Sequence, residues 1–232
     1  VRGLARVHGA TDGEADALLD AVAPAIASRR RRAPIAVQVA DDLPSRVVRA
    51  VLAALPARTS VIPWAGSAGH RVPTGAHVVL LAAHRVDPRR AATLLSDDVT
   101  HLPVTLDAGS ATIGPVVVPG RTACLACLDA ARRRVDAQWP TIAAQLLGRA
   151  HPDVDVALAA EAGRAARFLL SGPIVSTTRS LRLRADSSRR AWEMHRPSEE
   201  CHCRSPEGSA RETVPYAPGL APSSPTASAP LA

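Results

Sequence analysis

The amino-acid sequence predicts an α/β fold: a Rossmann-like parallel sheet with helices on both faces, followed by a C-terminal hairpin held by zinc. Two observations predict it. Short apolar runs alternate with helical segments from residue 33 to residue 109, as in a parallel sheet that is buried on both sides. All four cysteines of the chain fall into two close pairs that are far apart in the sequence, which suits a structural metal site.

Size and composition limit the classes of protein that fit. The 232 residues can form a sizeable core, and no apolar run approaches the length of a membrane span. The N-terminus has no signal-peptide pattern, so we expect a cytoplasmic protein. The net charge of +7 invites a nucleic-acid interpretation, but aromatic residues make up only 2% of the chain, which leaves few platforms for base stacking.

The first predicted unit is helical and covers residues 1–28. Thr11 and Glu14 have the spacing of a capping box, and Leu18, Leu19 and Val22 follow as a helical stripe. An arginine run at residues 29–32 then separates this unit from the predicted α/β domain, which covers residues 33–204.

Within that domain, the first half reads as strand–helix units. The apolar runs at 35–40, 59–64, 77–83 and 101–109 predict four strands. Helices are predicted at 41–55 and at 87–98, where Pro88 occupies the first turn.

The second half changes character. An additional strand is predicted at 110–120, and helices are predicted at 127–138, 141–150 and 154–172. Residues 177–195 alternate like a β-hairpin that turns at 185–188. Residues 205–232 form a Pro/Ser/Ala tail, which we expect to be disordered because it contains too little apolar surface.

The cysteine pairs are the strongest functional signal. Cys124 and Cys127 form a CxxC pair, and Cys201 and Cys203 form a CxC pair. Cytosolic thiols stay reduced, and four thiolates match the ligand set of a closed, tetrahedral structural zinc site. In two alternatives, His195 or His202 replaces one sulfur, or the thiols are free or redox-active.

Other residue types that carry chemistry are scattered. His84 follows a predicted strand end, and His101 precedes a strand with Asp107 six residues later. Cys124 could be a nucleophile beside His101, although the same sulfur is claimed by the metal site. We interpret both histidines mainly as polar residues at strand ends, and Trp139 as a packing anchor at a helix start, so no catalytic residue is assigned.

Three stretches also resemble a known family. HVVLLAA, HLPVTLDAGSATIGPVVVPGRTACLACLD and DAQWPTIAAQLL resemble the ThiF-like cyclodehydratase C-proteins of thiazole/oxazole-modified microcin (TOMM) pathways, also described as the bacteriocin biosynthesis cyclodehydratase domain. The resemblance covers about residues 35–204. It implies a ThiF-type sheet, kinship with ubiquitin-activating-type adenylating enzymes, and a four-cysteine zinc site beside a Rossmann-like ATP domain. It also implies peptide maturation, in which the chain binds a precursor and presents it to a partner that makes azolines, and it implies homodimers.

The sequence departs from this family in two places. The adenylating relatives have a Gly-rich phosphate turn after the first strand, whereas IAVQVADDLPSRVV contains no glycine and brings Asp41 and Asp42 there. The chain also lacks lysine, so we expect no ATP binding. Residues 1–28 could match only the last two helices of the family's winged-helix leader clamp.

The sequence therefore favours a non-catalytic, zinc-containing scaffold for peptide modification, which docks a precursor peptide or a partner cyclodehydratase. The alternatives are an ATP-dependent adenylating or cyclodehydratase enzyme and a zinc-stabilised nucleic-acid-binding protein.

Overall fold

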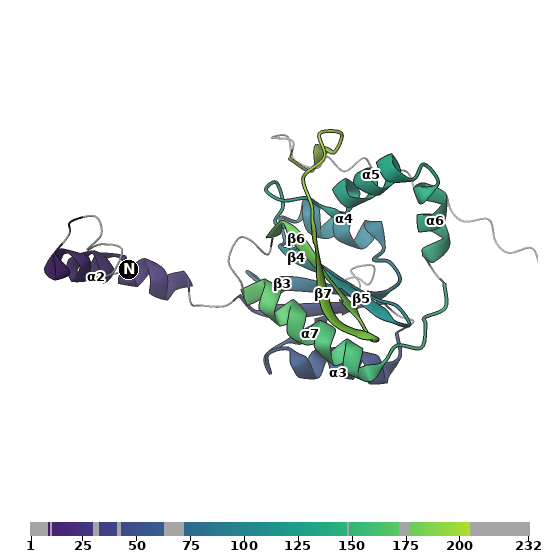
Figure 1. The fold of residues 1–232 in the computed structure, drawn as a ribbon, viewed down its shortest axis with the longest axis horizontal. Helices are drawn as coiled ribbons and strands as arrows, with labels where there is room; N and C mark the ends of the chain where they lie inside the picture. Colours follow the sequence, from purple (N-terminus) through teal and green to yellow (C-terminus); the bar gives the residue numbers. More distant parts are fainter. Residues whose placement is uncertain are drawn as a thin grey trace, which may run out of the picture.

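A computed structural model describes residues 9, 11–29, 33–40, 43–62, 72–147, 149–171 and 177–204 of the chain. Its centre is one seven-stranded sheet in the order β2-β1-β3-β4-β5-β6-β7, with helices above and below it (Figure 1). The α/β fold expected from the sequence is therefore confirmed. The predicted tail at 205–232 and residues Asp41 and Asp42 lie outside the described part of the chain.

The first four strands form the parallel half of the sheet. They are β1 (Ile35–Val39), β2 (Ser60–Ile62), β3 (His77–Ala83) and β4 (His101–Leu106). β1 pairs in parallel with β2 and β3, and β3 pairs in parallel with β4. β3 and β4 are buried almost throughout, which explains why both read as continuous apolar runs.

The last three strands are antiparallel, so the sheet is mixed rather than wholly parallel. They are β5 (Ser110–Ile113), β6 (Arg179–Arg184) and β7 (Ser187–Met194). β5 pairs with β4 through a short turn, and β6 and β7 form the expected hairpin. β5 is also shorter than predicted, because it ends before Pro115, which has no N–H to donate to a ladder. After Pro115 the chain returns to the sheet at Val117, which forms an isolated bridge to His101.

Helices cover both faces of the sheet. On one face, α3 (Ser45–Ala54) and α7 (Val156–Ser171) pack on the larger apolar core. On the other face lie α4 (Pro88–Ser96), α5 (Leu125–Val135) and α6 (Trp139–Leu146), as Figure 1 shows. This second face carries the candidate metal site, because α5 brings the CxxC pair to it.

The contact between α3 and α7 depends on one glycine. A Cβ atom at Gly163 would lie 2.6 Å from the carbonyl oxygen of Val51 and 2.9 Å from the Cβ of Ala54. The two helices can approach this closely only because residue 163 has no side chain.

The N-terminal unit contains α2 (Asp12–Arg29). Its capping box is confirmed: the backbone N–H and the hydroxyl of Thr11 each lie 2.8 Å from Glu14 Oε2, and the Glu14 N–H donates back to Thr11 Oγ1. Among the described residues, no helix has the length and apolar composition that crossing a bilayer requires.

Candidate metal centre

The first cysteine pair is placed by the turn that starts α5. Thr122 organises this turn, since its hydroxyl oxygen accepts from the Val118 N–H at 2.8 Å and its O–H donates to the Val116 carbonyl at 3.2 Å. Cys124 is the N-cap of α5 and has extended backbone angles. Cys127 lies three residues further along, on the same side of the first helical turn, so both sulfurs face one point.

The second cysteine pair comes directly after the hairpin. The Cys201 N–H donates to the Ser198 carbonyl at 3.1 Å, and a short 3₁₀ helix, η2 (His202–Arg204), follows. This tight turn lets two cysteines only two residues apart face the start of α5. Residues from the middle and the end of the described chain therefore meet at one place.

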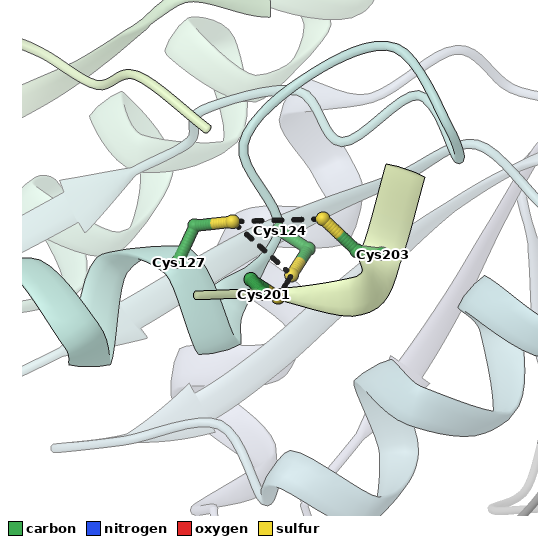
Figure 2. Close-up of side chains that lie close together, drawn as sticks. All are labelled: Cys124, Cys127, Cys201 and Cys203. Carbon is green, nitrogen blue, oxygen red and sulfur yellow. Dashed lines mark hydrogen bonds between the residues drawn. The ribbon is translucent and has the colours of Figure 1, made fainter. Parts of the chain in front are cut away.

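The four sulfur atoms form a compact cluster (Figure 2). Cys124 Sγ lies 3.8 Å from Cys127 Sγ and 3.6 Å from Cys201 Sγ, and Cys127 Sγ lies 3.5 Å from Cys203 Sγ. All four lie within 4.8 Å of one another. These distances are too long for a disulfide, in which the sulfurs are about 2.05 Å apart.

The same distances suit a tetrahedral metal ion. Zinc–sulfur bonds of about 2.3 Å at tetrahedral angles place the sulfurs about 3.8 Å apart. The donor set therefore fits zinc in number, type and spacing, and it leaves no position open for a substrate. A site of this kind stabilises a fold rather than activating water.

The buried sulfurs affect one another's protonation. The hydrogen bond from the Cys124 thiol lowers the pKa of Cys127, and the same bond raises the pKa of Cys124. Burial raises the pKa of Cys203. Protein groups alone thus favour one thiolate and disfavour more, because each further negative charge is buried beside the first. A divalent cation removes that repulsion when it binds.

An apolar shell and a charged rim surround the sulfurs. Val117 and Ala123 are buried against them, and Leu95, Leu125 and Leu128 pack around this group. On the outside, Glu200 lies 3.3 Å from Arg133 and 3.7 Å from Arg134. Part of the arginine run in α5 therefore pairs with the turn that carries Cys201.

Neither histidine proposed as an alternative ligand belongs to the sulfur cluster. His195 Nε2 lies 2.8 Å from Ser180 Oγ, and His202 is exposed. Among the described residues, the geometry therefore favours the four-cysteine set over a set with one histidine.

His101 does not have the environment of a catalytic base. It is fully buried, its Nδ1 donates to the Val99 carbonyl at 2.9 Å, and burial lowers its pKa to about 4. No hydrogen bond joins it to Cys124 in the described part of the chain. The interpretation of His101 as a polar residue in the sheet is thus favoured over the nucleophile–base pair.

Asp107 pairs with His84 rather than with His101. His84 Nδ1 lies 2.7 Å from Asp107 Oδ1, and His84 Nε2 lies 3.1 Å from the Ala150 carbonyl oxygen. Both partners are acceptors, so the ring satisfies both when it carries two protons. His84 has a positive φ of 51°, which turns its side chain across the strand end towards residue 150.

A further polar cluster lies under α5 and α6 and has no clear signal in the sequence. Arg85 binds Asp129 through two hydrogen bonds, of 2.9 and 2.5 Å, and the indole N–H of Trp139 donates to the same carboxylate at 3.0 Å. Arg132 lies over the Trp139 ring, 4.7 Å from its centroid. Trp139 is thus an anchor between α5 and α6, as expected, but a polar one.

Comparisons with known proteins find similar folds among solved structures. No family model matches the sequence, and no curated protein matches it. Among solved structures, the chain is similar to a heterocyclase in complex with substrate and cofactor, with a TM-score of 0.57 and 19% identity over 82% of this chain and 28% of that one. The heterocyclase TruD gives a TM-score of 0.55 and 17% identity over 75% of this chain and 28% of that one.

A chain of the E. coli microcin synthetase McbBCD complex gives a TM-score of 0.52 and 11% identity, over 72% of this chain and 67% of that one. The chain therefore spans little more than a quarter of the length of the two heterocyclases. At these identities the comparisons establish a shared fold, and they confirm at that level the resemblance expected from the sequence.

Proposed function

We propose that this chain is a zinc-stapled, non-catalytic scaffold in the maturation of ribosomally made peptides, where it docks a precursor peptide or a partner cyclodehydratase. The observation that carries the proposal is the tetrahedral spacing of Cys124, Cys127, Cys201 and Cys203 on a fold shared with heterocyclases. In this proposal zinc is structural: it ties the turn after the hairpin to the start of α5.

The start of α3 supports a role without ATP. No glycine occurs between residues 35 and 65. The Leu43 N–H already donates to the Ala40 carbonyl, and Pro44 has no N–H at all. A phosphate site at a helix start needs several free N–H groups, and neither Leu43 nor Pro44 offers one.

The names of the structural relatives support a role in peptide modification. They are heterocyclases and a microcin synthetase complex, so the proteins with this fold include machinery that modifies peptides. We extend that role to this chain as a proposal, and we expect it to act together with a catalytic partner.

Two measurements test the proposed function. The zinc-loaded chain should not bind Mg-ATP in isothermal titration calorimetry, and saturable micromolar binding with turnover would replace the scaffold by the adenylating enzyme. Added to a cyclodehydratase and its precursor peptide, the chain should raise the yield of heterocycles, measured by mass spectrometry as the loss of one water per ring. An equal yield without the chain would reject the scaffold role.

A further inference from the structure

The outer edge of the sheet is formed by β7, and part of its backbone faces outward. The His195 N–H donates inward to the Thr178 carbonyl at 2.7 Å. Inward and outward positions alternate along an antiparallel pair, so Trp192 and Met194, opposite Leu181 and Arg179, direct their N–H and C=O groups away from β6. In the described part of the chain no strand pairs with this edge.

Apolar side chains gather beside these outward backbone groups. Trp192 is 46% exposed, Met194 is 56% exposed, and Phe168 on α7 is 62% exposed. The chain contains one phenylalanine and one methionine in all, and both are on this surface. Large apolar side chains grouped in solvent are typical of an interaction site.

One ion pair links the flank of α7 that carries Phe168 to the face of β7 that carries Trp192 and Met194. Arg190 of β7 forms an ion pair with Glu161 of α7, and Phe168 lies two helical turns beyond Glu161 on the same flank. Trp192 stands opposite Leu181, whose side chain is buried in the core beneath α7.

The surroundings of this edge are cationic. Residues 179–196 contain six arginines and two acidic residues. Arg164 lies between Glu161 and Phe168 on the α7 flank, is exposed, and has no acidic partner within 4 Å among the residues that the structure describes. It lines a groove of about 490 Å³ together with Asp155 and with Arg184 and Arg190, which pair with Asp186 and Glu161. Arg164 is therefore the arginine of this groove that is left to meet a carboxylate of a ligand.

We propose that this surface, the β7 edge (residues 190–194 of β7 with Arg164 and Phe168 of α7), binds an extended acidic peptide segment as an additional strand. Backbone pairing with Trp192 and Met194 would supply affinity, as in strand addition to other sheet edges. Apolar side chains of the peptide would contact Phe168, Trp192 and Met194, and its carboxylates would lie near Arg164. Under the proposed function, on which this identification rests, the segment belongs to the precursor peptide.

The charge distribution favours this occupant over two others. A second copy of the chain would bring two arginine-rich edges together, and like charges on paired strands repel. A nucleic acid would use the arginines but could not use outward peptide groups that alternate with apolar side chains.

The direct test is fluorescence anisotropy with the full-length, zinc-loaded chain and a labelled short peptide of alternating glutamate and valine. We expect saturable binding that weakens as salt rises, and at least about tenfold weaker binding of the same peptide with lysine in place of glutamate. Equal affinity for both peptides would contradict the proposal. So would displacement of the peptide by oligothymidylate at a similar concentration.

Variants locate the binding site. Phe168→Ser and Trp192→Thr should each weaken binding about tenfold, and Arg164→Glu about fivefold. Met194→Pro should also weaken peptide binding, because proline lacks the outward N–H group that would pair with the peptide. The hydrogen bonds between β6 and β7 do not use that N–H group and should remain. Val135→Ser is the matched control, since Val135 is 91% exposed on α5 and lies outside the β7 edge.

The outcomes separate this inference from the proposed function. Each variant is accepted only if its zinc content and melting temperature match the parent chain. Equal weakening by Val135→Ser, or a dimer in light scattering that Trp192→Thr dissociates, would overturn the β7 edge as a peptide site. If heterocycle formation requires the chain but the edge variants bind the labelled peptide as tightly as the parent, only the β7 edge is rejected. If the labelled peptide binds at the β7 edge but heterocycles form equally well without the chain, only the scaffold role is rejected.

Discussion

Removing the metal from the cysteine cluster is expected to lower the free energy of unfolding by about 4–5 kcal/mol. The magnitude follows from the length of chain that the ion closes: Cys127 and Cys203 are 76 residues apart and their sulfurs lie 3.5 Å from each other. A cross-link across a loop of this size lowers the conformational entropy of the unfolded chain, and this raises the free energy of the unfolded state by about 4–5 kcal/mol. For a domain of this size the melting temperature should fall by roughly 10–15 °C.

Thermal unfolding followed by circular dichroism measures this effect. The chain is purified with a phosphine reductant, its zinc content is determined, and a chelator specific for zinc is added to one half. Cys203→Ser should reproduce the chelated state without chelator. His202→Ala is the matched control, because His202 lies in the same turn but outside the sulfur cluster, and it should keep both zinc and melting temperature.

Two results would refute this reasoning. One is a reduced, freshly purified chain that holds no stoichiometric transition metal. The other is a melting temperature that neither the chelator nor Cys203→Ser changes. Loss of zinc in His202→Ala would instead point to the ligand set with one histidine.

Three further predictions concern the sheet and its helices. Gly163→Ala should lower the free energy of unfolding by about 1–3 kcal/mol in urea titrations, because the new methyl group would meet the Val51 carbonyl; Gly13→Ala, with nothing within 4 Å, should not. Burial lowers the pKa of His101 from 6.5 to about 4. The stability of the fold that depends on the neutral ring is therefore complete above pH 6.5, and the free energy of unfolding falls by about 3 kcal/mol as the pH drops towards 4. His101→Asn should flatten that part of a plot of melting temperature against pH, and an unchanged slope would contradict the assignment. Asp129→Asn should lower the free energy of unfolding in urea by about 3 kcal/mol, because it leaves the charge of the largely buried Arg85 side chain without its partner; stability equal to the parent would show that the ion pair contributes little.

Local patterns predicted the elements that a single stretch of sequence determines. The apolar runs of β3 and β4 needed no partner to be recognised, and the Thr11–Glu14 capping box depends only on residues three apart. Two cysteine pairs also suffice to suggest a metal cluster, because zinc restricts the number and type of its ligands.

Features that depend on the arrangement of distant strands were not predictable in this way. The apolar residues of β5 do not indicate whether its partner runs parallel or antiparallel, so the sheet was expected to be more uniform than it is. His84 and Asp107 are adjacent only because β3 and β4 are neighbours, and the sequence instead suggested Asp107 with His101. Arg85 meets Asp129 across 44 residues, which no local spacing indicates.

Two links join the ends of the chain segment that contains α5, α6 and α7. The first link is the pairing of β5 with β6, in which Ser110 lies opposite Arg184, and the second is the sulfur cluster, in which Cys127 lies beside Cys203. Both links enclose almost the same length of chain, so without the ion the hairpin is held to the rest of the sheet by strand pairing alone. The main kinetic effect of metal removal should therefore be a faster opening of the finished hairpin.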